Sequence, residues 1–239
     1  MEDRIALVTG SSRGIGRDIA LKLAESVGGV AVHYFSQRQD ALGVVENIRQ
    51  KGTRSVAFRA DLSSEKSANL LIQRVQDRFG RLDILINNFG PILVKPWKKV
   101  TTKEWESVYR RNLLSALFCM KAVLPGMRRR KWGRIVNLGY SRVEQLTAFT
   151  TITPYAIAKT GLLLLTRTAA HTEASAGITV NMFSPGLMEG DVLPKKDEHV
   201  PAGRLGKYDD ISSAVLFLVS KDAGYVTGTN LLVAGGWKL

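Results

Sequence analysis

A tyrosine and a lysine four residues apart, Tyr155 and Lys159, are the side chains of this sequence best suited to acid–base chemistry. Thr153 and Pro154 precede them as a helix cap and a proline at the first helical position, which predicts that both lie on one helix. At this spacing they share a face, and the ammonium would lower the tyrosine pKa from about 10, as proton transfer at neutral pH requires. Taken alone, such a pair is usually a surface pair, so the rest of the chain decides its meaning.

Three glycines, Gly10, Gly14 and Gly16, follow the apolar run Ile5–Val8 and open an amphipathic stretch that continues to Ala24. The segment is therefore predicted to form a strand, then a glycine turn, then the start of a helix. Residues without a Cβ can reach positive φ, and they let a pyrophosphate approach backbone N–H groups at the positive end of a helix dipole. The pattern therefore favours a dinucleotide site, with a tight turn that binds nothing as the alternative.

Short apolar runs recur along the chain between longer segments with helical periodicity. This βαβ alternation predicts a parallel sheet covered by helices on both faces, with ligands at the carboxyl ends of the strands. We expect the α/β class, as a single doubly wound (Rossmann) domain over residues 1–239 with a parallel sheet of about seven strands flanked by helices. Thr101 and Glu104 form a capping box that begins one helix. The apolar runs are Ile5–Val8, Val30–Val32, Val56–Phe58, Ile84–Ile86, Ile135–Val136, Ile178–Val180 and Leu231–Val233.

A series of motifs occurs in order between Arg4 and almost the last residue: Thr9–Gly16, Asp61–Leu62, Asn87–Gly90, Asn112, Tyr155 with Lys159, and Pro185–Gly186. Together they make the chain resemble the short-chain dehydrogenase/reductase family. Within that family it is most similar to β-ketoacyl-ACP reductases, on the segments 201–204 and 226–228. The resemblance implies one group of residues that bind the cofactor: Gly10, Ser12, Arg13, Gly14, Ile15, Gly16, Asp61, Leu62, Asn88, Gly90, Tyr155, Lys159, Pro185 and Gly186.

The resemblance also implies a proton relay and a carbonyl reduction. Asn112 would hold a water that continues through Lys159 to Tyr155, and Tyr155 would protonate the carbonyl oxygen as hydride arrives at carbon. We expect no metal in this site. Each residue also has a simpler interpretation, in which Asp61 starts a loop, Asn88 caps backbone groups at a strand end and Asn112 makes only local bonds within a helix.

One catalytic position departs from the family pattern. Where the family places a serine after the fifth strand, this chain has Tyr140 with Ser141 next to it, and the stretch to Tyr155 is about two residues longer. Either Ser141 supplies the hydroxyl, or Tyr140 replaces it with a phenol, or the group that polarises the carbonyl is lost; we favour Ser141. Losing such a donor costs roughly 3 kcal/mol of transition-state stabilisation, which slows catalysis without abolishing it.

The turn after the second strand indicates the cofactor. An acidic residue there usually binds the ribose hydroxyls of NAD, whereas a 2′-phosphate needs cations or hydroxyls. No carboxylate occurs before Asp40, and Arg13, Ser36 and Arg38 are candidate phosphate ligands, since arginine grips phosphate bidentately. We expect NADP. If Arg38 is only a solvent-exposed loop residue, the choice between NAD and NADP stays open.

The formal net charge of +13 raises the question of acidic partners. Basic residues cluster at Lys95, Lys98–Lys99 and Arg128–Lys131, and such runs attract polyanions. An acidic carrier protein bearing an acyl-thioester carbonyl substrate is one candidate and a phosphorylated or CoA-linked small molecule another, although a solvated basic face is the default. His171–Thr172, where the family often has charged residues, weakens the carrier hypothesis. The tryptophans form no stacking module, so we expect no nucleic acid.

Length and composition suit one α/β core of a cytoplasmic enzyme. No apolar run approaches the roughly 18 residues of a membrane span, no leader is evident, and we expect no membrane association. The lone Cys119 cannot form an internal disulfide, which suits a reducing compartment, and it is expected to be an inert core thiol. A homotetramer or homodimer is implied through the apolar faces of segments 116–123 and 162–166.

Apolar loops after the strands predict a substrate pocket for an apolar carbonyl compound, and segment 190–200 is expected to act as a lid. Two functions follow: an NADP-dependent carbonyl reductase, or a dinucleotide-binding regulatory or scaffold protein whose catalysis has decayed, an alternative raised by Tyr140. The expected lining residues are Phe89, Pro91, Ile92, Leu93, Val143, Leu146, Phe149, Ile152, Leu187 and Met188.

Overall fold

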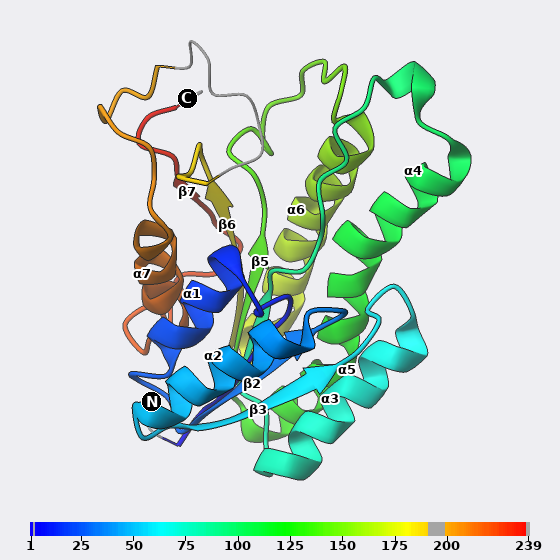
Figure 1. Ribbon diagram of the computed structural model, residues 1–239. Helices are drawn as coiled ribbons and strands as arrows, with labels where there is room; N and C mark the ends of the chain where they lie inside the picture. The colour runs from blue at the N-terminus through cyan, green and yellow to red at the C-terminus, as the bar shows by residue number, and fades with distance from the viewer. Residues whose placement is uncertain (2, 191–198, 238–239) are drawn as a thin grey trace.

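A computed structural model describes residues 1, 3–190 and 199–237, and within these residues seven parallel strands form one sheet (Figure 1). The strands are β1 (Ile5–Val8), β2 (Gly29–Tyr34), β3 (Arg54–Arg59), β4 (Ile84–Asn87), β5 (Gly133–Leu138), β6 (Ile178–Pro185) and β7 (Asn230–Val233). Their spatial order is β3-β2-β1-β4-β5-β6-β7. This order reverses between β1 and β4, which confirms the doubly wound α/β fold and places the ligand crevice at the carboxyl ends of the strands.

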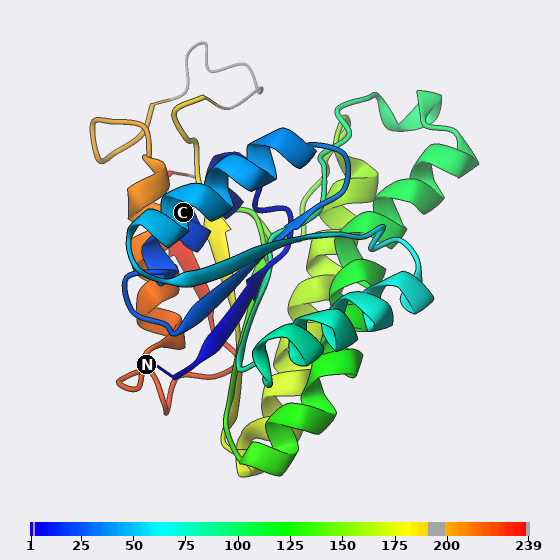
Figure 2. The same cartoon turned by 60° about the horizontal axis from the view of Figure 1, so that its bottom comes forward.

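Helices cover both faces of the sheet (Figures 1 and 2). Helices α1, α2 and α7 pack on one face, and α3, α5 and α6 pack on the other. The helices are α1 (Gly14–Leu23), α2 (Arg38–Gln50), α3 (Glu65–Phe79), α4 (Thr102–Tyr109), α5 (Ser115–Arg130), α6 (Thr153–Glu173) and α7 (Tyr208–Val219), with the short turns η1 (Trp97–Lys99), η2 (Arg110–Leu114) and η3 (Ala174–Ala176).

Strand β1 shows why the apolar runs are continuous instead of alternating. Successive side chains of a strand point to opposite faces, and here both faces are covered. Ile5 and Leu7 pack into the layer with α3 and α5, Ala6 and Val8 into the layer with α1 and α2, and none of the four is exposed. Burying a side chain the size of leucine contributes about 2 kcal/mol, so both layers stabilise the strand.

The two expected helix starts differ in outcome. The capping box is confirmed: the Thr101 hydroxyl accepts the Glu104 N–H at 3.3 Å, and the Glu104 carboxylate accepts the Thr101 N–H at 2.8 Å. The cap at Thr153 was wrong by one residue, since Ile152 occupies the cap position and Thr153 is already helical. The reason is a competing acceptor, because the Thr153 hydroxyl donates to the carbonyl of Phe149 in the preceding loop.

Candidate active site

A cavity of about 530 Å³ opens beyond the carboxyl ends of β5 and β6. Gly139 follows β5 in its wall, and Ile15 in the first turn of α1 also lines it. Five of the ten expected lining residues do not line it: Phe89, Pro91, Leu93, Val143 and Leu146. Val143 is fully buried in a core cluster, and Leu146 is 93% exposed. The expected residues that do line the cavity are Ile92, Phe149, Ile152, Leu187 and Met188.

Tyr155 and Lys159 lie together on the buried face of α6, as their spacing predicts. Tyr155 lines the cavity, and the Lys159 ammonium lies 5.5 Å from the centre of the Tyr155 ring. The ammonium donates a hydrogen bond of 2.7 Å to the carbonyl of Leu138, which anchors it to the end of β5. Burial lowers the pKa of Lys159 to about 7. A negative charge beside the ammonium, such as a phenolate, would favour the charged form of the lysine.

Asn112 is positioned by η2, a π-helical turn between α4 and α5. The side-chain amide donates to the carbonyls of Pro91 (3.0 Å) and Val108 (3.1 Å). Its Oδ1 is buried, and no described residue donates to it. Gly90 covers that oxygen, since a Cβ there would lie 2.3 Å from it. A buried acceptor in this state is one that an ordered water would satisfy.

Tyr140 and Ser141 both line the cavity, so the structure brings the two candidates for the carbonyl donor together. The Tyr140 ring packs edge-on against Phe149 and Tyr155, with ring centres 5.8 and 5.7 Å apart. Burial raises the pKa of Tyr140 to about 12, although Arg142 and the nearby Thr160 hydroxyl act in the opposite direction. The Thr160 hydroxyl donates to the carbonyl of Val143, and no hydrogen bond of regular geometry from the described residues reaches the Tyr140 oxygen. That oxygen has almost no accessible surface, so it is not presented to the cavity. The Ser141 backbone N–H donates to Pro185 at 3.1 Å, which holds this segment against β6.

The glycine loop has the shape that a pyrophosphate needs. Gly10 and Gly14 adopt φ of +63° and +57°, where a side chain is strained. A Cβ on Gly16 would lie 2.4 Å from the Gly10 carbonyl, so the helix start can lie this close only with glycine. Arg13 at the cap position of α1 makes no side-chain cap, so it leaves the first helical N–H groups available to a ligand. These residues fit the phosphates of a dinucleotide, and Ser12 beside them is buried.

The residues expected around the adenosine end occupy the neighbouring loops. Ser36 and Arg38 are exposed between β2 and α2, and the Arg38 N–H donates to the Ser36 carbonyl at 3.0 Å. The Asp61 carboxylate accepts from the backbone and hydroxyl of Ser63 at 3.0 and 2.8 Å, which is the loop-starting geometry of its simpler interpretation. Leu62 is buried in the core beside α3.

Two further positions are tied to the strand ends. The Asn88 amide donates to the carbonyls of Thr9 and Gly10, both at 3.0 Å, so it braces the glycine loop. Pro185 and Gly186 line the cavity, and a Cβ on Gly186 would lie 2.6 Å from Ala234. The chain after β6 therefore passes the cavity only because this residue is glycine.

His33 in β2 also braces the glycine loop, and sequence reasoning missed it. The Gly10 N–H donates to its Nδ1 at 2.9 Å, so the ring proton lies on Nε2, which donates to the Ala60 carbonyl at 3.2 Å. The backbone of His33 exchanges hydrogen bonds with Ser11. Burial lowers the pKa of His33 to about 4, so the ring is neutral at physiological pH. A polar residue within an otherwise apolar strand was the available signal.

The basic runs are partly neutralised within the chain. Three of their cations form ion pairs: Arg128 with Glu173 (2.6 Å), Arg130 with Asp83 (3.1 Å) and Lys95 with Glu104 (2.8 Å). Arg128 and Arg130 end α5, which precedes β5, so they lie at the amino end of the sheet, away from the cavity. The run Arg128–Lys131 therefore adds no charge at the cavity mouth. Lys95 lies beside the cavity, since its N–H donates to the carbonyl of the lining residue Thr151 at 2.7 Å.

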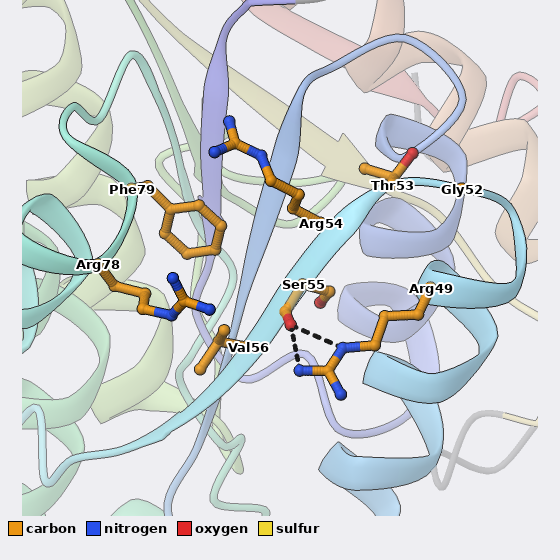
Figure 3. A pocket seen from close by; sticks show the side chains of 8 residues that line it. All are labelled: Arg49, Gly52, Thr53, Arg54, Ser55, Val56, Arg78 and Phe79. Carbon is orange, nitrogen blue, oxygen red and sulfur yellow. Dashed lines mark hydrogen bonds between the residues drawn. The ribbon is translucent and has the colours of Figure 1, made fainter.

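A second hollow, of about 300 Å³, lies at the amino end of the edge strand β3 (Figure 3). Arg49 reaches it from α2, Arg54 from β3 and Arg78 from α3. The Arg49 guanidinium donates to the Ser55 carbonyl at 3.1 and 2.9 Å, and Arg54 donates to the Gly28 carbonyl at 3.0 Å. Two of the three arginines thus satisfy backbone groups beside the sheet edge.

Comparisons with known proteins agree with this geometry. Residues 10–238 match the family model described as enoyl-(acyl carrier protein) reductase. The chain is 38% identical to the 3-oxoacyl-(acyl-carrier-protein) reductase FabG of Staphylococcus epidermidis, over 98% of both proteins. This chain belongs to the short-chain dehydrogenase/reductase family. It is therefore an oxidoreductase, and enzymes of this family use a nicotinamide dinucleotide.

Other similar proteins are named as dehydrogenases of different substrates. The chain is 36% identical to the (2S)-((R)-hydroxy(phenyl)methyl)succinyl-CoA dehydrogenase subunit BbsD of Thauera aromatica, over 100% of this chain and 98% of that one. The acetoin dehydrogenase YohF of Salmonella typhimurium superposes with a TM-score of 0.88 at 27% identity, over 98% and 95% of the two chains. A candidate short-chain alcohol dehydrogenase of Sinorhizobium meliloti superposes at 0.92 with 33% identity, over 99% and 96%.

Three remaining expectations concern the lid, a membrane span and Cys119. Residues 191–198 of the expected lid lie outside the described residues, so only the ends of that segment are placed. Among the described residues no helix is both long and apolar enough to cross a bilayer. Cys119 is buried, and burial raises its thiol pKa to about 12, which matches the inert core thiol expected from the sequence.

Proposed function

We propose that the protein is an NADPH-dependent carbonyl reductase, with a 3-oxoacyl thioester as its first candidate substrate. The observation that carries this proposal is the buried pair of Tyr155 and Lys159 beside a cavity that the glycine-loop helix also lines. A protein that only binds a dinucleotide has no need of a lysine buried behind the wall of an apolar cavity, where it donates to the carbonyl of the lining residue Leu138.

Each group has a role in the proposed reaction. The Tyr155 phenol protonates the carbonyl oxygen, and the Lys159 ammonium stabilises the phenolate that remains. The Ser141 hydroxyl polarises the carbonyl, because the Tyr140 oxygen is enclosed. The unpartnered Asn112 Oδ1 holds the water that returns a proton through Lys159. Bound cofactor supplies the hydride that the carbonyl carbon accepts.

The preference for NADPH rests on the loops at the ends of β1 and β2. Arg13 and Arg38 are both exposed, and neither forms an ion pair with a described residue, so both are free to bind a 2′-phosphate with the Ser36 hydroxyl. The turn between β2 and α2 contains no carboxylate that would favour the ribose hydroxyls of NADH; Asp40 comes later, in the first turn of α2.

The acyl-thioester substrate is supported by the relatives named as 3-oxoacyl-(acyl-carrier-protein) reductases and by the apolar lining of the cavity. An acidic carrier protein would deliver it. Because Arg128, Arg130 and Lys95 already form internal ion pairs, such a carrier would use other cations than these. We further propose a cytoplasmic homodimer or homotetramer, in which the exposed Ile157 and Leu164 of α6 contact another copy.

A binding protein with decayed catalysis is the second candidate, and Tyr140 is the observation that favours it. A phenol ring stands where the family has its serine, and it packs against Tyr155. This function predicts tight cofactor binding without turnover.

The experiment is NADPH oxidation followed by absorbance, against ketones, diketones and 3-oxoacyl thioesters, with NADH in parallel. We expect turnover of at least one compound with NADPH preferred. Turnover with NADH preferred would overturn the phosphate assignment for Arg13, Ser36 and Arg38. Tight NADPH binding without turnover across the panel would favour the binding protein.

A further inference from the structure

Arg142 is the only charged side chain among the described residues that line the active-site cavity. The other lining side chains are apolar or carry a neutral hydroxyl or indole group. Arg142 directly follows Ser141, the proposed carbonyl donor, so their Cα atoms lie about 3.8 Å apart. A cation thus lies one residue along the chain from the proposed carbonyl donor, in the wall of the same cavity.

The Arg142 guanidinium is held in place by neutral groups. Its Nε donates to the Gln145 side chain at 2.8 Å, and its central carbon lies 4.8 Å from the centre of the Phe149 ring. Within the described chain, no carboxylate lies within ion-pairing distance of it, and its two terminal nitrogens donate no hydrogen bond. The side chain is half-buried, so water replaces a counterion only in part.

The arginines at the other hollow are used differently. Arg49 donates from Nε and one terminal nitrogen to a backbone carbonyl, and Arg54 donates from Nε to another, both beside an open sheet edge. Arg142 instead lines an apolar cavity, where both of its terminal nitrogens are free of hydrogen bonds to the described residues. A planar guanidinium with two free nitrogens matches a carboxylate or a phosphate bidentately.

We propose that the substrate is a carbonyl compound that itself carries an anionic group, a carboxylate or a phosphate, and that Arg142 binds this group. The inference rests on the proposed reductase activity and narrows its substrate class. A simple acyl thioester has no charge beside its carbonyl, so the anion would be a second recognition element close to the reacting carbon.

Matched substrates test the inference. Kinetics of the holoenzyme with NADPH are measured for acetoacetate against its ethyl ester, and for 2-oxopropylphosphonate against its diethyl ester. We expect kcat/KM to favour one anion over its ester by at least about 10-fold. The better anion identifies the source, carboxylate or phosphate.

Two variants locate the effect. Arg142→Met should lower kcat/KM for the favoured anion about 100-fold while the ester changes less than about 3-fold, and Arg142→Lys should recover part of the loss. Arg49→Met, at the opposite end of the sheet, is the matched control and should change neither. Equal losses for anion and ester, or no loss for the anion, overturn the inference.

The inference and the proposed function fail in distinguishable ways. Reduction of esters or ketones with no preference for their anions leaves the reductase intact and overturns the role of Arg142. If no compound is reduced, calorimetry of 3-hydroxybutanoate and 2-hydroxypropylphosphonate into the protein with NADP⁺ still decides. Binding of one of them that is lost in Arg142→Met supports the anion site, and absence of binding overturns it.

Discussion

The two hollows of this molecule differ in how their polar atoms are satisfied. At the amino end of β3, Arg49 and Arg54 donate to backbone carbonyls, and the hollow of Figure 3 is a protected sheet edge. At the carboxyl ends, Asn112 Oδ1 and the Tyr140 oxygen are buried without partners, and Arg142 has no counterion among the described residues. Unsatisfied buried groups cost about 1–3 kcal/mol each. The active-site cavity therefore lowers the stability of the protein, and a ligand, a substrate or an ordered water that satisfies these groups would offset the loss.

The largest expected effect follows from removing the proton donor. Tyr155→Phe keeps the ring that lines the cavity and removes only the hydroxyl, so kcat should fall at least about 100-fold. The Kd for NADPH should stay within about 3-fold, as measured by fluorescence titration. Turnover that persists in Tyr155→Phe would show that Tyr155 is not the proton donor. The active-site cavity would then lack the reactive group that distinguishes it from the arginine hollow.

The next effect distinguishes the two residues after β5. Ser141→Ala should lower kcat about 100-fold, since one lost oxyanion donor is worth roughly 3 kcal/mol. Tyr140→Phe should change kcat less than about 3-fold and stabilise the protein slightly, because it removes an unpartnered buried oxygen. Single-turnover kinetics and urea unfolding measure both. The reverse ranking of the two variants would make the phenol the polarising group.

Much of this site was predictable because its chemistry depends on local geometry. The glycine loop and the Tyr155–Lys159 pair need only a turn and one helix face, and the apolar runs give the sheet that joins them. The doubly wound α/β class followed from the βαβ alternation, whereas the order of the strands comes from the structure. These features depend on residues close together in sequence, so the spacing of residue types along the chain predicts them.

The remainder depends on irregular segments and long-range contacts. Leu146 and Arg142 lie in the same loop after β5, yet one is 93% exposed and the other lines the cavity. No period of 2 or 3.6 governs such a loop, so the sequence did not separate them. His33 was missed for the second reason, since its partner Gly10 lies 23 positions earlier in the chain.

The third expected effect is a pH dependence of stability from His33. Its pKa is about 4 in the folded protein and 6.5 when unperturbed, so between these values the unfolded chain binds a proton that the folded chain does not. The free energy of unfolding should therefore fall as the pH decreases through this window, by about 2 kcal/mol between pH 7 and 5. At pH above 6.5 this contribution is constant.

His33→Asn gives the matched comparison. An asparagine can accept the Gly10 N–H through its Oδ1 without titrating, so its stability should lose about 2 kcal/mol less between pH 7 and 5. Urea unfolding at the two pH values measures the difference. Parallel losses in both proteins would mean that His33 does not titrate as described. His33→Leu should also raise the Kd for NADPH, because the glycine loop loses its brace.

The smallest effect is expected at the edge hollow. Arg49→Met removes the two hydrogen bonds to the Ser55 carbonyl, and since the edge of β3 is open to water, the free energy of unfolding should fall by only about 0.5–1.5 kcal/mol. Activity should stay within about 2-fold of the wild type, because no cavity side chain touches this strand end. Urea unfolding and steady-state kinetics measure the two quantities. A fall in kcat with no loss of stability beyond this range would show that the arginine hollow is coupled to the active site. The two hollows would then not be independent, as the comparison above assumes.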